Sequence, residues 1–175
     1  SSDLFYLCSE RSVAMEGVFL FGCPLTGEVA PISQCSDPTF AQGMLGPGAV
    51  IRPAGCQVLA PAGATVEFTL STKHALGLVT PEGIKFLIHV GMDTNKLEGH
   101  GFRLFVQTGD QVKRGDKLLE FDPQVMAKHH CNLDTPLVFC NCGTGWKMEL
   151  LKTGLLPAGE DFLRLTALPA PRQAP

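Results

Sequence analysis

Short apolar stretches alternate with turn-forming residues along most of the chain. The sequence has 19 glycines and 13 prolines, which recur throughout and bound these stretches. This punctuation is typical of an all-β domain with many turns. The pattern predicts strands over residues 18–21, 27–31, 49–53, 65–78, 84–90, 117–121, 137–139 and 162–165.

Helical signals are weak and short. "DPTFAQGML" predicts one helical turn capped by Asp37 with Pro38 at the first helical position, and "DPQVMAKHH" repeats this device from Asp122. Three segments, "PLTGEV", "PAGATV" and "TGDQVKRGDKLLEFD", each place a turn directly before an apolar strand. We therefore predict a β-sandwich or barrel with internal pseudo-repetition and at most short helical turns.

Two histidines lie in stretches that otherwise have the pattern of buried strands. Between them, "TPEG" at 80–83 has Pro second and Gly fourth, which favours a β-turn. If Thr80 pairs with Gly83 across that turn, the antiparallel register places His74 directly opposite His89. Their Cβ atoms would then be about 4.5–5.5 Å apart. Thr72, two residues before His74, would share its face, and the hairpin predicts a Thr, His, His cluster.

Composition limits the classes of protein to consider. A chain of 175 residues, 45% hydrophobic and 18% charged, suits one domain with a substantial core. The net charge of −3 and the scattered Lys and Arg residues exclude a basic footprint for nucleic acid. No apolar run approaches the ~18 residues of a bilayer span, and the start lacks the features of a signal peptide. We expect a soluble, cytosolic protein.

The cysteines and the ends of the chain contribute little to the functional hypothesis. Seven cysteines are irregularly spaced without a CxxC motif, which favours free buried thiols. Residues 1–16 lack clear periodicity, and residues 167–175 are rich in Pro and Ala. Both segments are interpreted as tails or linkers.

Three chemistries are open for a pair of buried imidazoles. A metal site needs a third or fourth ligand, and "AKHHCN" (129–131 and neighbours) supplies no clear one, so no metal is predicted. A hydrolase needs a nucleophile, a base and an orienting acid, but Asp93 is the only acid nearby. Phosphoryl carriage fits best, because a neutral imidazole is nucleophilic and a second can stabilise the phosphoryl oxygens. Without a GxxxxGK[ST] loop, we expect a phosphoprotein donor rather than ATP, and no cofactor.

The sequence resembles the glucose-type IIA domain of the bacterial phosphoenolpyruvate-dependent sugar phosphotransferase system (PTS). The resemblance extends over most of the chain through "PLTGEV", "DPTFAQGMLGPG", "APAGATV", "TKHA", "FLIHVGMDT", "LEGHGF", "GDQVKRGD" and "EFD". It implies a β-sandwich of the duplicated hybrid motif type over 17–166. It also implies that His89 accepts a phosphoryl group from phospho-HPr and passes it to a cysteine of a IIB domain, that His74 stabilises this group, and that Thr72 supports His74.

The resemblance further implies a shallow apolar docking surface around the histidines. Its expected members are Asp37, Phe40, Met44, Leu45, Leu70, Leu76, Leu87 and Asp93, with the two acids facing basic residues of the partner. A membrane would be met only through the transporter partner. One alternative is a regulatory module that senses phosphorylation without relaying it, but the retention of both histidines disfavours it. Another is a LytM-like zinc peptidase, which the missing HxH motif disfavours.

Overall fold

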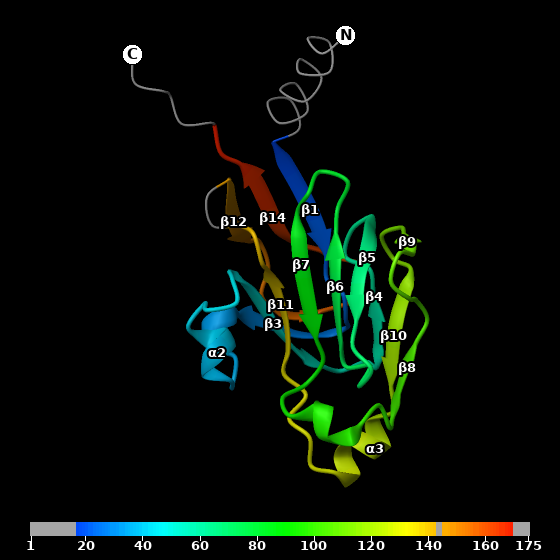
Figure 1. Ribbon diagram of the computed structural model, residues 1–175. Helices are drawn as coiled ribbons and strands as arrows, with labels where there is room; N and C mark the ends of the chain where they lie inside the picture. Colours follow the sequence, from blue (N-terminus) through cyan, green and yellow to red (C-terminus); the bar gives the residue numbers. More distant parts are fainter. Residues whose placement is uncertain (1–16, 143–144, 170–175) are drawn as a thin grey trace.

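An eight-stranded antiparallel sheet forms one wall of the fold. The computed structural model describes residues 17–142 and 145–169, and Figure 1 shows the arrangement of these parts. In spatial order the strands of this sheet are β13 (Gly154–Leu156), β2 (Gly27–Pro31), β3 (Gly48–Pro53), β11 (Thr135–Phe139), β7 (Lys85–His89), β6 (Ala75–Val79), β5 (Ala64–Thr69) and β9 (Gln111–Val112).

Two smaller antiparallel sheets complete the β structure of the described residues. The first has the order β1 (Val18–Gly22), β14 (Asp161–Ala167) and β12 (Trp146–Leu150), and the second β4 (Gln57–Leu59), β10 (Lys117–Phe121) and β8 (Phe102–Leu104). The helical elements between the strands are short, namely η1 (Ile32–Gln34), α2 (Pro38–Ala41), η2 (Thr94–Leu97) and α3 (Pro123–Lys128). The prediction of an all-β fold with short helical turns is confirmed.

The main core lies between the large sheet and the two small sheets. Phe21 of β1 packs edge-on against Phe139 of β11, with ring centroids 5.0 Å apart, and against Phe86 of β7 at 5.7 Å. Leu119 of β10 and Leu163 of β14 are fully buried in the same cluster. Because all three sheets contribute apolar side chains to one interior, the architecture is the predicted sandwich type.

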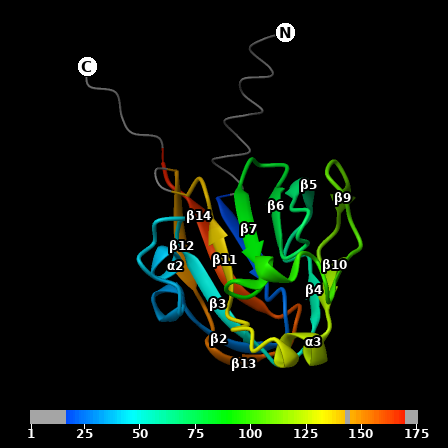
Figure 2. The same ribbon diagram turned by 60° about the horizontal axis from the view of Figure 1, so that its bottom comes forward.

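A second, smaller core holds α2 on the other face of the large sheet. Phe40 of α2 is buried there with Val50 of β3, Val138 of β11 and Met92. Figure 2 shows α2 beside β3 at one side of the molecule, with β10 at the other. The predicted N-caps are confirmed, since Asp37 accepts a hydrogen bond from the backbone N–H of Thr39, and Asp122 caps α3 in the same way.

Most predicted strands are present, but one was wrong. The stretch 65–78, predicted as a single strand, is two strands, β5 and β6, separated by a turn at 70–74. Five short strands, β4, β8, β9, β12 and β13, were not predicted, and each is only two to five residues long. The predicted division into domain and tails stays a prediction: residues 1–16 and 170–175 lie outside the described residues, and Ala167, assigned to the C-terminal tail, ends β14.

Candidate functional site

The register predicted for the histidine hairpin was wrong by one residue. His89 of β7 lies opposite Ala75, not opposite His74. The loop has three residues rather than two, because the N–H of Thr80 bonds to the carbonyl of Ile84 and Gly83 takes the left-handed conformation at φ 91°. A glycine in that conformation is typical of three-residue hairpin loops.

The two rings nevertheless meet, because His74 lies outside the regular strand. A turn closed by the N–H of Lys73 and the carbonyl of Leu70 precedes it, and Lys73 itself has a φ of 61°. This break releases His74 from the alternation that would otherwise send its side chain to the opposite face from His89. The N–H of Val90 donates to the carbonyl of His74 at 2.7 Å and holds the end of the hairpin together.

The imidazoles of His74 and His89 form a perpendicular pair. Their ring centroids are 4.6 Å apart and their planes are inclined at 87°. The hydroxyl of Thr72 is 2.8 Å from Nδ1 of His74, so this nitrogen has a hydrogen-bond partner. The structure therefore brings together the three residues that the sequence placed in one cluster.

His89 has two unlike nitrogens. Its Nδ1 is buried, and no described residue meets the geometry of a hydrogen bond with it, although the Gly91 backbone lies close by. The ring of Phe40 packs against the imidazole at a centroid distance of 5.3 Å. Because Nδ1 is enclosed, Nε2 is the remaining candidate for bond formation.

Both imidazoles are held in the neutral form. The pKa of His74 is lowered to about 4, mainly by burial and secondarily by the nearby His89, against a smaller opposing effect of a hydrogen bond to the Thr72 backbone. Burial also lowers the pKa of His89, which the backbone of Gly91 and the negative charge of Asp37 partly offset. A neutral imidazole keeps one lone pair for bond formation and one N–H for donation.

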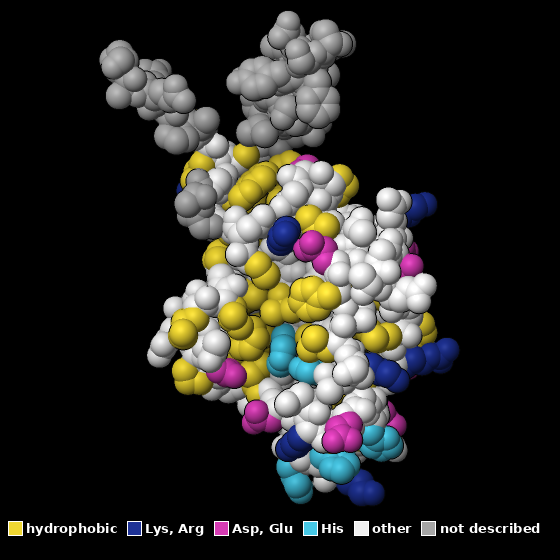
Figure 3. Space-filling view, viewed as in Figure 1, with side chains coloured by type: hydrophobic (Ala, Val, Ile, Leu, Met, Phe, Trp, Pro, Cys, Tyr) yellow, Lys and Arg dark blue, Asp and Glu magenta, His cyan; other side chains and the backbone are white. Residues whose placement is uncertain are grey.

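The histidine pair lies in a shallow depression of about 480 Å³. Figure 3 shows histidine side chains surrounded by apolar ones near the middle of this face, with acidic side chains close by. The depression is lined by residues from α2 and its cap, the turn before β6, the end of β7 and the segment after it. They are Asp37, Phe40, Leu70, Thr72, His74, His89, Met92, Asp93 and Asn95.

One residue predicted for the docking surface was wrong. Leu76 is 0% exposed in the main core, because its side chain points to the inner face of the large sheet, so it cannot contact a partner. By contrast Met44, Leu45 and Leu70 are exposed, and Leu87 is half-buried against the second core.

Met92 is a residue of the site that was not predicted from the sequence, whereas Asn95 was expected there as a polar residue at a position that the resemblance makes apolar. Met92 and Asn95 line the depression together with the histidines. Met92 belongs to the "HVGMDT" motif, but strand alternation stops at Gly91, whose φ is 79°. Strand alternation therefore cannot predict on which face of the sheet a residue after Gly91 lies.

Comparisons with known proteins agree on one family. Residues 20–144 match the family described as phosphoenolpyruvate-dependent sugar phosphotransferase system, EIIA 1. The solved structure of glucose permease IIA from Mycoplasma capricolum is similar, with 31% sequence identity, a TM-score of 0.79, and coverage of 84% of this chain and 95% of that chain. The chain therefore belongs to the EIIA family of the sugar phosphotransferase system. Within that family it is a IIA domain of the glucose type.

The helices in the described part of the chain are short. None of its helices combines the length and the apolar character needed to cross a membrane.

Proposed function

We propose that this IIA domain carries a phosphoryl group on Nε2 of His89. It accepts the group from phospho-HPr and passes it to a cysteine of a IIB domain, which couples transfer to sugar uptake. The observation that supports this most directly is the neutral imidazole of His89, whose Nδ1 is enclosed, beside a second imidazole 4.6 Å away. In the first step the bond between phosphorus and the donor breaks as the bond to Nε2 forms, and in the second that bond breaks as the bond to sulfur forms.

His74 would stabilise the phosphoryl group chiefly while it leaves His89 for the IIB cysteine. If the Thr72 hydroxyl donates to Nδ1 of His74, the neutral ring carries its proton on Nε2. That N–H can then donate to a phosphoryl oxygen. Phosphoryl transfer depends mainly on positioning and on such electrostatic stabilisation, so Thr72 contributes by selecting the tautomer.

The surface around the depression would dock both partners. Apolar contact would come from the exposed Met44, Leu45 and Leu70 and from the accessible parts of Phe40 and Leu87. Asp37 and Asp93 on its edge would pair with basic side chains of the partner. In this proposal the domain works in the cytoplasm and meets a membrane only through its transporter partner.

A labelling experiment tests the carrier function. Incubation with phosphoenolpyruvate, the first PTS enzyme and HPr is expected to add one acid-labile phosphoryl group, located on His89 by mass spectrometry. The variant His89→Ala should take up no label, because the proposed nucleophile is gone. A label retained in that variant would refute the assignment. Normal labelling without onward transfer to a IIB cysteine would favour the regulatory alternative instead.

A charge placed on the docking surface is expected to weaken binding. Met44 is 72% exposed beside α2, so Met44→Asp should leave the free domain folded yet force a partner to cover a carboxylate. We expect the Kd for HPr, from NMR titration, to rise about tenfold, equivalent to about 1.4 kcal/mol. Leu155→Asp is the matched control, because Leu155 is 73% exposed on β13 and outside the depression. Equal affinities for both variants would show that the surface lies elsewhere.

A further inference from the structure

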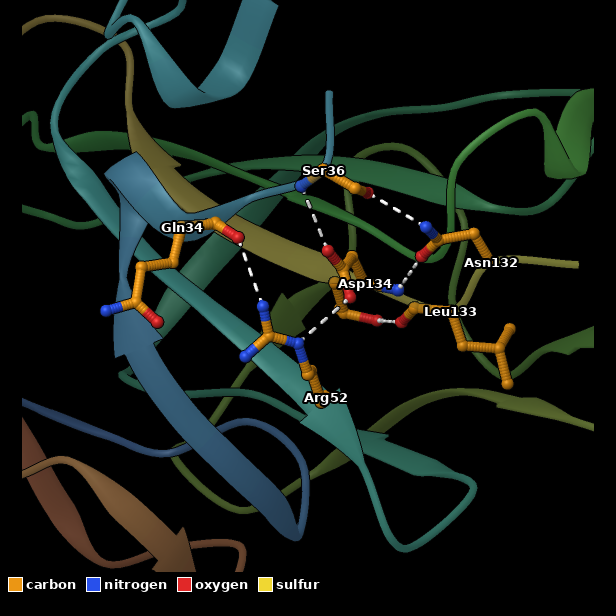
Figure 4. A network of polar contacts seen from close by, with 7 residues as sticks. Gln34, Ser36, Arg52, Asn132, Leu133 and Asp134 are labelled. Carbon is orange, nitrogen blue, oxygen red and sulfur yellow. Dashed lines mark hydrogen bonds and ion pairs between the residues drawn. The ribbon is translucent and has the colours of Figure 1, made fainter. Parts of the chain in front are cut away.

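The segment 132–134 lies between the two walls of the phosphorylation site and bonds to both. One wall is the start of α2, which carries Asp37 and Phe40, and the other is the segment after β7, which carries Met92 and Asp93. Figure 4 shows the polar contacts around this segment. Its side chains reach the first wall, and its backbone reaches the second.

The side-chain contacts hold the residue that precedes the α2 cap. Oδ2 of Asp134 accepts a hydrogen bond from the backbone N–H of Ser36 at 3.0 Å, and the amide of Asn132 donates to the Ser36 hydroxyl at 2.9 Å. Oδ1 of Asp134 pairs with Arg52 at 3.5 Å, and Arg52 donates to the carbonyl of Gln34 at 3.1 Å. The chain that precedes Asp37 is thus held at two residues, Gln34 and Ser36.

The backbone contacts hold the segment that follows His89. The N–H of Gly91 donates to the carbonyl of Asp134 at 3.1 Å, and the N–H of Met92 donates to the carbonyl of Asn132 at 2.8 Å. Within the segment, the side chain of Asn132 accepts from the N–H of Asp134 at 2.8 Å. The segment therefore has a fixed shape between its two attachments.

Because Asp134 is buried, its hydrogen bonds fix how the two walls are placed relative to each other. Its carboxylate pairs with Arg52, and the residue is only 8% exposed, so it is stable there only with its partners in place. The walls also meet through apolar contacts of Phe40 and Met92 in the second core. Apolar packing is non-directional, whereas hydrogen bonds to Ser36 and Gly91 set a particular separation and orientation.

We propose that Asp134 and Asn132 are positioning residues for phosphoryl transfer, which set the placement of Asp37 and Phe40 relative to His89. Neither side chain is among those that line the depression, and both act through backbone or side-chain bonds to residues that adjoin it. The inference rests on the proposed carrier function. Its physical basis is that small misplacements of positioning groups slow group transfer strongly.

Two substitutions of Asp134 test this assignment. Asp134→Ala removes the acceptor for the Ser36 N–H, while Asp134→Asn keeps an oxygen there but removes the charge. We expect the first-order rate of phosphoryl acceptance at saturating HPr to fall about tenfold in the alanine variant and less than about threefold in the asparagine variant. The nuclear Overhauser effect between the rings of Phe40 and His89 should weaken in the alanine variant and persist in the asparagine variant.

Controls separate positioning from a purely structural role. Glu149→Gln breaks the ion pair with Arg164 on the β12–β14 sheet, so it should lower stability without changing either readout. If Asp134→Ala does not fold, Asn132→Ala, which removes the exposed hydrogen bond to Ser36 and the bond accepted from the Asp134 N–H, should still slow transfer about threefold. A folded Asp134→Ala protein with normal rate and normal ring contact would overturn the proposal, as would equal losses in the alanine and asparagine variants. The ring contact is measured without phosphorylation, so it decides this point even if wild-type His89 takes up no label.

Discussion

Replacement of His74 by glutamine is expected to slow transfer from phosphorylated His89 to the IIB cysteine by about 10² to 10³-fold. Acceptance of the group from HPr should fall much less, by no more than about tenfold, since the nucleophile Nε2 of His89 is unchanged. This expectation rests on the proposed carrier function. It separates the roles of the two histidines, because a nucleophile and a stabilising group fail differently when they are removed.

The reason for the unequal effect lies in the geometry of the pair. The ring of His74 lies perpendicular to that of His89 at 4.6 Å, and Thr72 holds its Nδ1. Glutamine retains an N–H donor but has neither the rigid ring nor the bond to Thr72. Charge on the departing phosphoryl group would then be stabilised by a flexible amide, which must be ordered at the moment of reaction.

Separate single-turnover measurements decide this prediction. Labelled HPr delivers the group to the variant in one experiment, and the prelabelled variant delivers it to the IIB domain in the other. His129→Gln is the control, since it removes an exposed imidazole next to α3 and should change neither half-reaction. Equal losses in both half-reactions, or none in either, would show that His74 is only a structural residue.

The free energy of unfolding is expected to fall steeply as the pH drops from about 6.5 towards 4. The pKa of His74 is lowered from 6.5 to about 4 in the folded protein. Between these two values the unfolded chain binds a proton that the folded protein does not, so stability rises with pH across this window and is complete above it. The downward shift of the His89 pKa acts in the same direction.

The size of this effect can be isolated by comparison with His74→Gln. Between pH 7.5 and pH 4.5, the wild type should lose about 2 to 3 kcal/mol more than the variant, because each unit of pKa shift corresponds to about 1.4 kcal/mol. Urea unfolding at intervals of half a pH unit measures it. Carboxylates that titrate in the same range are common to both proteins and cancel in the difference. Parallel curves for wild type and His74→Gln would contradict the assignment of a buried, neutral His74.

Much of the fold and the composition of the site could be predicted from local sequence alone. β2 and β10 have the predicted bounds, because Pro and Gly turns fix where an apolar strand begins and ends. Asp37 and Asp122 could be recognised as caps, since the hydrogen bond each makes lies within two residues of itself. Thr72 and His74 were placed together for the same reason.

The segment around Asp134 shows where such prediction ends. "NLDTPLVF" contains an acid directly before a buried strand, but its partners, Ser36 and Arg52, lie more than 80 positions earlier in the chain. Helix and strand periodicity relate only residues that are close in sequence, so neither could predict these contacts. The contact arises because β11 inserts between β3 and β7, and that strand order is a property of the whole sheet.

The sequence by itself determined the β class, the capped turns and the presence of a Thr, His, His cluster, because each depends on residues close together in the chain or on one hairpin. Only the tertiary structure decided the register of that hairpin, the turn at 70–74 that brings His74 to His89, and the burial of Leu76. The physical reason is that a strand's side chains alternate with a period of two. A single left-handed residue such as Lys73, or one added loop residue, reverses which face each later side chain occupies.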